Sequence, residues 1–305
     1  MSTNESILVL GTGELGTEVL RTLAFHTHRN LRPITVLLRP YPPDVEATQR
    51  RKQQLTEFQS AHISTVEANI AEDSQSVLET IIGQYHTVIG CSGMTYPPGT
   101  QLKIARAVLA SSARRYFPWQ FGVDYDVIGR GSSQDLFSEQ LDVRDLLRGQ
   151  NKTDWVIIST GLFMSLLFEP IFGVVERDWT AVTALGAWDT RVTVTSVQDI
   201  ARVVAEVVWV APAVKGVIYT AGATVSYRDV ADAVAERQQN RGFTIRRELT
   251  TIDQLRNELE SDPDNGMKKY RVVFAEGKGV AWDESETFNS RWGMEMCGVQ
   301  AWLSK

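Results

Sequence analysis

Short apolar segments alternate with amphipathic segments through the first half of the chain. The apolar segments have the length of buried strands and comprise Ile7–Leu10, Ile34–Leu38, Ile63–Val66, Thr87–Cys91, Arg115–Phe117 and Trp155–Ile158. The amphipathic segments predict helices at about Leu15–Ala24, Val45–Gln59, Ser74–Gly83, Thr100–Ala113 and Ser133–Arg148. In the first of these, Leu15, Val19 and Leu23 form one apolar stripe at helical spacing. The alternation predicts an α/β fold of the Rossmann type, a doubly wound parallel sheet with helices on both faces.

The alternation is less regular in the second half of the chain. A tryptophan-rich stretch leads to a predicted hairpin around Gly186, and Val217–Thr220 predicts a buried strand that returns to the sheet. We therefore expect residues 1–160 to form a dinucleotide-binding Rossmann domain. Residues 161–305 are expected to form mostly a smaller, discontinuous substrate-binding lobe.

Two Ser-x-x-Asp tetrads in the second half predict helix starts. Ser196 with Asp199, and Ser226 with Asp229, have the spacing of a capping box, which satisfies free backbone N–H groups. Both are structural signals. Asp262–Gly266, which contains a proline and an asparagine, predicts an exposed loop.

Composition narrows the class of protein. The chain has 305 residues, of which 43% are hydrophobic and 22% charged, so it is expected to fold throughout. The net charge of −6 and the pI of about 5.4 give no basic surface for nucleic acid. Two cysteines and four histidines show no metal-ligand spacing, which argues against a zinc site or a disulfide framework.

No segment has the pattern of a targeting or membrane sequence. Ile7–Leu10 is too short for the core of a signal peptide. Trp155–Val175 is interrupted by polar residues and a proline, unlike a bilayer span. We expect a cytoplasmic protein with neither a membrane nor a nucleic-acid partner, and the sequence leaves open whether the chain forms a homodimer.

A glycine motif follows the first predicted strand directly. Gly11-Thr12-Gly13-Glu14-Leu15-Gly16 matches G-x-G-x-x-G and opens the first predicted helix. In this context the first glycine permits a tight turn, the second lets the backbone approach a pyrophosphate, and the third lets helix pack on strand. The alternative is a strand-to-helix turn without a ligand. The motif predicts a dinucleotide cofactor.

The end of the second predicted strand indicates which dinucleotide binds. NAD-binding domains commonly carry an acid there, but this chain has Arg39. A guanidinium suits a 2′-phosphate, whereas a carboxylate would repel it. Arg51, near the start of the following helix, is a second candidate partner, and the alternative for Arg39 is an ordinary surface arginine. The cofactor is predicted to be NADP(H).

On these motifs the chain resembles the NmrA-like and isoflavone-reductase-like branch of the atypical short-chain dehydrogenases. The resemblance covers nearly the whole chain and rests on the segments Gly11–Gly16, Leu38-Arg39, Arg115–Gly122 and Ser159–Phe163. The third is the most specific, because the family pattern there is similar to Arg-Phe-x-Pro-Ser-Glu-Phe-Gly.

This chain departs from that pattern with Trp119 and Gln120, a version that looks most like fungal members. The resemblance implies that these loops lie over the nicotinamide. The cofactor site is then expected to include the glycine motif, Arg39 and Arg51, together with Ser92, Gly93, Phe117, Pro118, Trp119, Phe121, Gly161 and Phe163.

The catalytic residues of related enzymes are replaced. No tyrosine has a lysine four residues later, so the Tyr-x-x-x-Lys pair of ordinary short-chain dehydrogenases is absent. Reductases of the isoflavone type use a lysine on the helix after the fifth strand, and matching that helix puts Gln140 at its position. Leu136, Val143 and Leu147 make the surrounding helix face apolar. Gln140 is therefore either a substrate or nicotinamide contact, or a buried amide bonded to backbone.

Two functions from different classes fit these observations. The first is an NADP(H)-dependent oxidoreductase that moves hydride to or from a hydrophobic secondary metabolite, an alkaloid-like imine, iminium or conjugated C=C/C=N, with or without a coupled cyclisation. Glutamine cannot deliver a proton, and an iminium needs none. The second is an NmrA-like redox sensor that binds NADP(H) without turnover, and loss of the lysine would suit it.

Candidate side chains for the substrate site fall into two groups, and for each residue packing or solvation is the alternative. An aromatic and thioether pocket would comprise Trp119, Phe121, Met164 and Phe168, with Tyr96 or Trp188. Carboxylates able to stabilise a cationic acceptor are Glu139, Asp142, Asp124 and Asp126.

Overall fold

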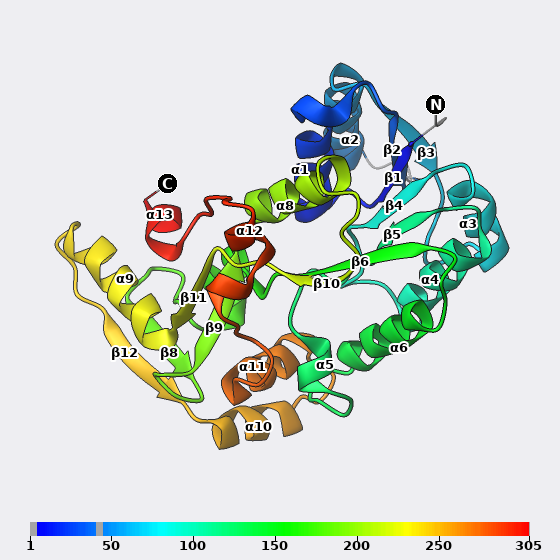
Figure 1. The fold of residues 1–305 in the computed structure, drawn as a ribbon. Coiled ribbons are helices and arrows are strands. Elements are labelled where there is room, and N and C mark those ends of the chain that lie inside the picture. Colours follow the sequence, from blue (N-terminus) through cyan, green and yellow to red (C-terminus); the bar gives the residue numbers. More distant parts are fainter. Residues whose placement is uncertain (1–4, 41–44, 305) are drawn as a thin grey trace. The chain divides into compact units, whose positions relative to one another are not determined.

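The computed structural model describes residues 5–40 and 45–304. Its largest element is a seven-stranded sheet with the order β10-β6-β5-β4-β1-β2-β3 (Figure 1). These strands are β1 (Ile7–Leu10), β2 (Ile34–Leu38), β3 (Ile63–Glu67), β4 (Thr87–Gly90), β5 (Arg115–Phe117), β6 (Asp154–Ser159) and β10 (Gly216–Tyr219). The pairs that link β3, β2, β1, β4, β5 and β6 are parallel. This 3-2-1-4-5-6 order is that of doubly wound dinucleotide-binding sheets, so the predicted fold class is confirmed.

Helices flank this sheet on both faces. Figure 1 shows α1 and α8 on one face and α3, α4 and α6 on the other. The longer helices that connect the strands of this sheet are α1 (Glu14–Phe25), α2 (Val45–Ser60), α3 (Gln75–Ile82), α4 (Thr100–Ala110), α6 (Leu136–Arg148) and α8 (Val197–Trp209). The predicted stripe of α1 is buried, since Leu15, Val19 and Leu23 are at most 4% exposed. The short 3-10 helix η1 (Thr27–Arg29) follows α1.

Two helices are shorter than predicted because of polar contacts at their ends. The predicted helix to Ala113 stops at Ala110, where the ammonium of Lys152 donates to the carbonyls of Leu109 and Ser111. These bonds satisfy carbonyls at the end of the helix. The helix predicted from Ser133 begins at Leu136, whose backbone N–H donates to the side-chain oxygen of Gln134 at 3.4 Å.

The remaining strands form two small sheets. One has the order β11-β9-β7 and the other pairs β12 with β8. Their strands are β7 (Leu162–Phe163), β8 (Ala181–Leu185), β9 (Arg191–Thr195), β11 (Ala223–Ser226) and β12 (Arg246–Thr250). The hairpin predicted around Gly186 is wrong. Gly186 does make a tight turn with φ +80°, but β8 pairs in parallel with β12, while β9 joins β7 and β11.

The remaining helices lie outside the central sheet's own succession of strands and helices. They are α5 (Tyr125–Ile128), α7 (Met164–Phe168), η2 (Pro170–Phe172), α9 (Tyr227–Gln239), α10 (Ile252–Glu260), α11 (Gly266–Glu276), η3 (Glu284–Glu286), α12 (Phe288–Arg291) and α13 (Val299–Leu303). Both predicted capping tetrads form. Ser196 and Ser226 accept the backbone N–H of Asp199 and Asp229 at the starts of α8 and α9.

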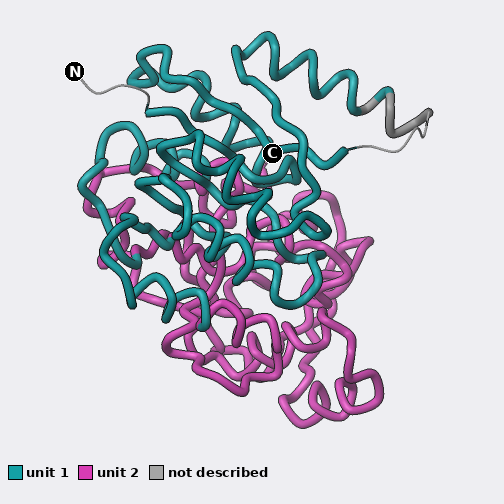
Figure 2. Tube along the Cα trace, turned by 90° about the vertical axis from the view of Figure 1, so that its right-hand side faces the viewer, with its two compact units in different colours: residues 1–120, 142–157, 201–217 teal, residues 121–141, 158–200, 218–305 magenta. Residues whose placement is uncertain are grey.

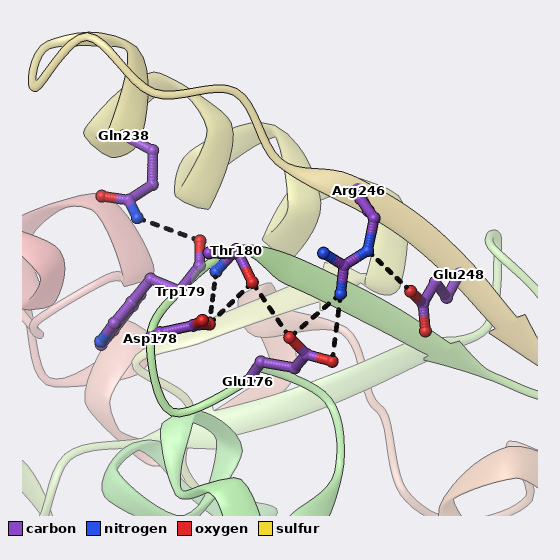
Figure 3. A network of polar contacts seen from close by, with 7 residues as sticks. All are labelled: Glu176, Asp178, Trp179, Thr180, Gln238, Arg246 and Glu248. Atoms are coloured by element: carbon purple, nitrogen blue, oxygen red, sulfur yellow. Dashed lines mark hydrogen bonds and ion pairs between the residues drawn. The ribbon is translucent and has the colours of Figure 1, made fainter.

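A polar network fixes the turn that leads into β8 (Figure 3). The Thr180 hydroxyl donates to Glu176 at 3.0 Å and to Asp178 at 2.7 Å, and Arg246 of β12 bridges Glu176 and Glu248 at 3.2 Å. The bonds from Thr180 lower the pKa of the Asp178 carboxyl. These contacts lie at the edge of the two-stranded sheet and have a structural role.

The chain divides into two compact units (Figure 2). Unit 1 comprises residues 1–120, 142–157 and 201–217, and unit 2 comprises residues 121–141, 158–200 and 218–305. Each unit has its own hydrophobic core. The division into domains 1–160 and 161–305 stays a prediction. In the described part of the chain, no helix is long and apolar enough to cross a membrane.

Candidate cofactor and substrate sites

The three glycines of the β1–α1 turn have three different environments in unit 1. Gly11 has φ +101°, and a Cβ added there would lie 2.5 Å from Cβ of Ser92. A Cβ at Gly16 would overlap the Gly11 carbonyl oxygen and lie 2.9 Å from its carbon. A Cβ at Gly13 would meet nothing within 4 Å. Gly11 and Gly16 are therefore required by the fold itself, whereas the protein's own packing leaves Gly13 open.

The open position is the start of a helix. Gly13 is the N-cap of α1, and no side chain caps it. The first backbone N–H groups of α1 thus lack an intrahelical partner and carry the positive end of the helix dipole. Of the other motif residues, Glu14 is exposed and Leu15 is buried in the core.

The loop before α1 is held by two side chains. The carbonyl of Thr12 accepts the Thr17 hydroxyl at 3.1 Å and the Gln54 amide at 3.5 Å. These bonds tie the turn to α1 and α2. The backbone that a polar ligand at Gly13 would contact is therefore held in place by these two bonds.

Two arginines lie at the end of β2. Arg39 is exposed, while the Arg51 side chain, from α2, is only 16% exposed. The Arg51 guanidinium donates to the Arg39 carbonyl at 3.4 Å and lies 3.7 Å from a carboxylate oxygen of Glu67 at the end of β3. The structure therefore brings Arg51 beside Arg39, and a contact of either residue with a 2′-phosphate stays a prediction.

Trp119 packs on the loop that follows β4. A Cβ at Gly93 would overlap the Trp119 ring and lie 2.7 Å from the amide nitrogen of Gln101. That amide donates to the Ser92 carbonyl at 3.4 Å. Ser92, Gly93 and Trp119, which are far apart in sequence, are thus brought together within unit 1. Phe117 and Pro118, just before Trp119, are buried.

A buried polar pair follows Trp119 in the chain. The Gln120 side-chain oxygen accepts the Arg144 Nε–H at 2.8 Å, and both residues are at most 1% exposed. Gln140 lies one turn before Arg144 on α6 and is 1% exposed. Gln120 thus has a structural partner on α6, which sequence reasoning did not find.

In unit 2 the two remaining loops of the predicted nicotinamide site lie side by side. The Gly122 carbonyl accepts the backbone N–H groups of Thr160 and Gly161 at 2.9 and 3.0 Å. Gly161 has φ +71°, and a Cβ there would overlap the backbone of Thr193. Phe121 is buried, and Phe163 is half-buried in β7. The segments around Phe121 and Phe163 are therefore fixed to each other.

The predicted aromatic and thioether residues are mostly accounted for by packing. Met164 is fully buried in the core of unit 2. Phe168 stacks on Trp302 at 4.6 Å and on Trp179 at 5.7 Å between ring centroids. Trp188 and Tyr96 are half-buried against the cores of unit 2 and unit 1, respectively. A substrate contact for these residues stays a prediction.

The four predicted carboxylates differ in burial. Asp126 is exposed on α5, and Glu139 and Asp142 are half-buried on α6. Asp124 is 9% exposed, and its carboxylate accepts the Tyr219 hydroxyl at 2.7 Å. Neither Tyr219 nor its contact with Asp124 was predicted, because a pair separated by 95 positions leaves no local signal.

Comparison with known proteins places the chain in a family. No model of a known protein family matches it. It is 45% identical over 302 residues to an NmrA-like family domain-containing oxidoreductase from Gibberella moniliformis, with 98% of this chain and 97% of that protein covered. The chain belongs to the NmrA-like family. The resemblance identified from the motifs is therefore confirmed.

Solved structures share the fold of this NmrA-like chain. An isoflavone reductase matches with a TM-score of 0.78, 16% identity and 99% of each chain covered. AtPrR2 with NADP+ and (+)pinoresinol matches with a TM-score of 0.79, 14% identity and 99% coverage of each chain. The leucoanthocyanidin reductase of Vitis vinifera in complex with NADPH matches with a TM-score of 0.75, 16% identity and 98% coverage of each chain. At these identities the likeness establishes the fold.

Proposed function

We propose that this NmrA-like protein is an NADP(H)-dependent oxidoreductase that moves hydride to or from a hydrophobic, alkaloid-like imine, iminium or conjugated C=C/C=N, with or without a coupled cyclisation. The observation that carries the proposal is the open space at Gly13 between two sterically required glycines. The name of the 45% identical relative, an oxidoreductase, supports it. So do neighbours of the same fold whose structures contain NADP+ or NADPH.

The residues of unit 1 fit an NADP(H) molecule. The uncapped N-terminus of α1 suits a pyrophosphate, because free N–H groups and the helix dipole both favour negative charge. Arg39 is exposed and Arg51 is held beside it, so two guanidinium groups can pair with a 2′-phosphate. A phosphate there would compete with Glu67 for Arg51.

The bound nicotinamide would supply or accept the hydride, and the protein's part is to bind, orient and exclude water. Gln140, at the position where the resemblance implies a lysine, is buried and has no acidic proton to give at neutral pH. A ketone reduced here would lack a positioned acid, a loss of roughly 10²- to 10⁴-fold in rate. An iminium is already positively charged before it accepts hydride. Its reduction needs no proton donor, so glutamine in place of lysine does not slow it.

The test is single-turnover decay of NADPH absorbance with panels of hydrophobic imines, enones and ketones. We expect decay with imines for the wild type and a modest loss for Gln140→Ala, about 1–3 kcal/mol from lost orientation. Gln140→Lys should be slower still, because it puts a cation beside a cationic acceptor. A Gln140→Lys variant that is faster on imines would contradict the cationic acceptor, and one that is faster on ketones would point to a carbonyl substrate.

One observation favours a second function, a redox sensor that binds NADP(H) without turnover. The glutamine at the lysine position would be expected in such a protein. The same experiment separates the two functions, because a sensor would bind NADPH and show no decay with any acceptor.

A further inference from the structure

We propose that Asp124, Tyr219 and Trp282 form the subsite for the positively charged nitrogen of the substrate. The ligand class is a flat, hydrophobic organic cation, such as an iminium or a quaternary ring nitrogen. This inference rests on the proposed function only for the substrate class. Its geometry lies wholly within unit 2.

The negative charge comes from a buried carboxylate. Asp124 is 9% exposed, and its two carboxylate oxygens accept the Val127 backbone N–H at 3.2 Å and the Tyr219 hydroxyl at 2.7 Å. Both donors are neutral, so they orient the carboxylate and neither of them supplies a positive charge. A buried charge is costly unless it is paired, and an organic cation would pair it.

Two aromatic rings accompany this carboxylate. The rings of Tyr219 and Trp282 meet edge to face, with centroids 5.1 Å apart and planes at 65°. Both residues are half-buried, so neither ring is fully enclosed by the core. Because aromatic faces attract cations and apolar rings alike, a carboxylate with two such rings matches a flat cation.

The position of Trp282 is fixed by its own hydrogen bonds. Its backbone N–H donates to the Thr193 hydroxyl at 3.1 Å, and its indole N–H donates to the Thr220 carbonyl at 3.2 Å. The second bond ties the indole to the residue that follows Tyr219. The two rings are therefore held in one geometry before any ligand arrives.

The segment before Trp282 is fitted against Asp124. The Asp124 backbone N–H donates to the Gly279 carbonyl at 2.8 Å. Gly279 has φ +69°, and a Cβ there would lie 2.8 Å from the Asp124 carbonyl oxygen. A side chain at position 279 would push this segment away from Asp124. The glycine therefore lets the segment that leads to Trp282 pack directly against the backbone of Asp124.

The probes for the test are N-methylisoquinolinium and 2-methylnaphthalene, which have nearly the same shape and differ in a ring nitrogen and its charge. Binding to the full-length protein is measured by equilibrium dialysis, with and without NADP+. We expect the wild type to bind the cation at least about 10-fold more tightly than the neutral probe. Asp124→Asn should remove that preference and change the affinity for 2-methylnaphthalene by less than about twofold.

Asparagine still caps a helix, so Asp124→Asn keeps the bond to Val127. Trp282→Leu is a second variant. It is expected to weaken binding of the cationic probe by roughly 3- to 10-fold, because the aromatic ring is lost. Asp253→Asn is the control, since it removes a carboxylate that is 92% exposed on α10 of the same unit and should leave both affinities unchanged.

A wild type without preference for the cation, or equal losses for both probes in Asp124→Asn, would overturn the subsite. A cation preference that depends on Asp124 would support it whether or not hydride is transferred. Failure of the subsite and failure of the proposed function are therefore separate results, because only the latter is read from NADPH decay.

Discussion

Replacing Gly13 by valine is expected to remove dinucleotide binding while leaving the fold intact. A Cβ at Gly13 meets no protein atom within 4 Å, and the residue has φ −70°, which any L-amino acid adopts. The cost to the fold is the poorer N-cap alone, about 1 kcal/mol. For a chain of this size that corresponds to a melting temperature lower by about 2–4 °C.

The cost to binding is much larger. A valine side chain at the start of α1 would occupy the space through which a pyrophosphate reaches the free N–H groups. Losing two hydrogen bonds to a charged phosphate, at about 1.5–3 kcal/mol each, amounts to about 3–6 kcal/mol. The affinities for NADPH and for NADH should both fall by roughly 10²- to 10⁴-fold.

The assay is isothermal titration calorimetry with both cofactors, together with thermal melting of the free proteins. Gly266→Val is the matched control, because Gly266 also begins a helix, in unit 2, and an added Cβ there meets nothing within 4 Å. It should melt like the wild type and bind NADPH normally. A Gly13→Val variant that binds NADPH within about threefold of the wild type would refute the reasoning, and the glycine motif would then be only a turn.

Three further variants test other parts of the structure. Arg39→Ala should weaken NADPH by roughly 10- to 150-fold and NADH little, and equal losses in calorimetry would remove the 2′-phosphate assignment. Gly93→Ala should displace the Trp119 ring and cost about 1–3 kcal/mol of stability, so an unchanged urea midpoint would contradict the packing of that ring. Phe168→Ala should cost about 3–5 kcal/mol in urea unfolding, and a loss below about 1 kcal/mol would mean that the stack with Trp302 is not formed.

Local sequence patterns predicted the parallel sheet well. The strands β1 to β6 are found at the predicted segments. β1, β2 and β4 are short, fully buried runs, whereas only Ile63 is buried in the edge strand β3. The glycine motif was equally clear, since its spacing directly after a strand and before a helix is a local signal. Gly16 is explained by contact with the Gly11 carbonyl within the turn, and Gly11 by contact with Ser92, just after β4, the strand that pairs with β1.

Long-range pairing limited the prediction of unit 2. Gly186 has the turn conformation that the pattern suggested, yet β8 pairs with β12, which lies far along the chain. A hairpin signal reports the turn and cannot report which strand becomes the partner. For the same reason Tyr219 and Trp282 were missed, because they meet only through the folded arrangement of β10 and the segment after α11.

Deuteride transfer from labelled cofactor tests most directly whether this protein is an oxidoreductase. The wild-type protein is incubated with a hydrophobic cyclic imine and NADPH that carries deuterium on one or the other face of the nicotinamide C4. If the protein transfers hydride, the amine product gains a single deuterium from one of the two labelled cofactors and none from the other. Absence of deuterium in the product with both cofactors, although NADPH binds, would contradict hydride transfer and leave a protein that only senses the dinucleotide.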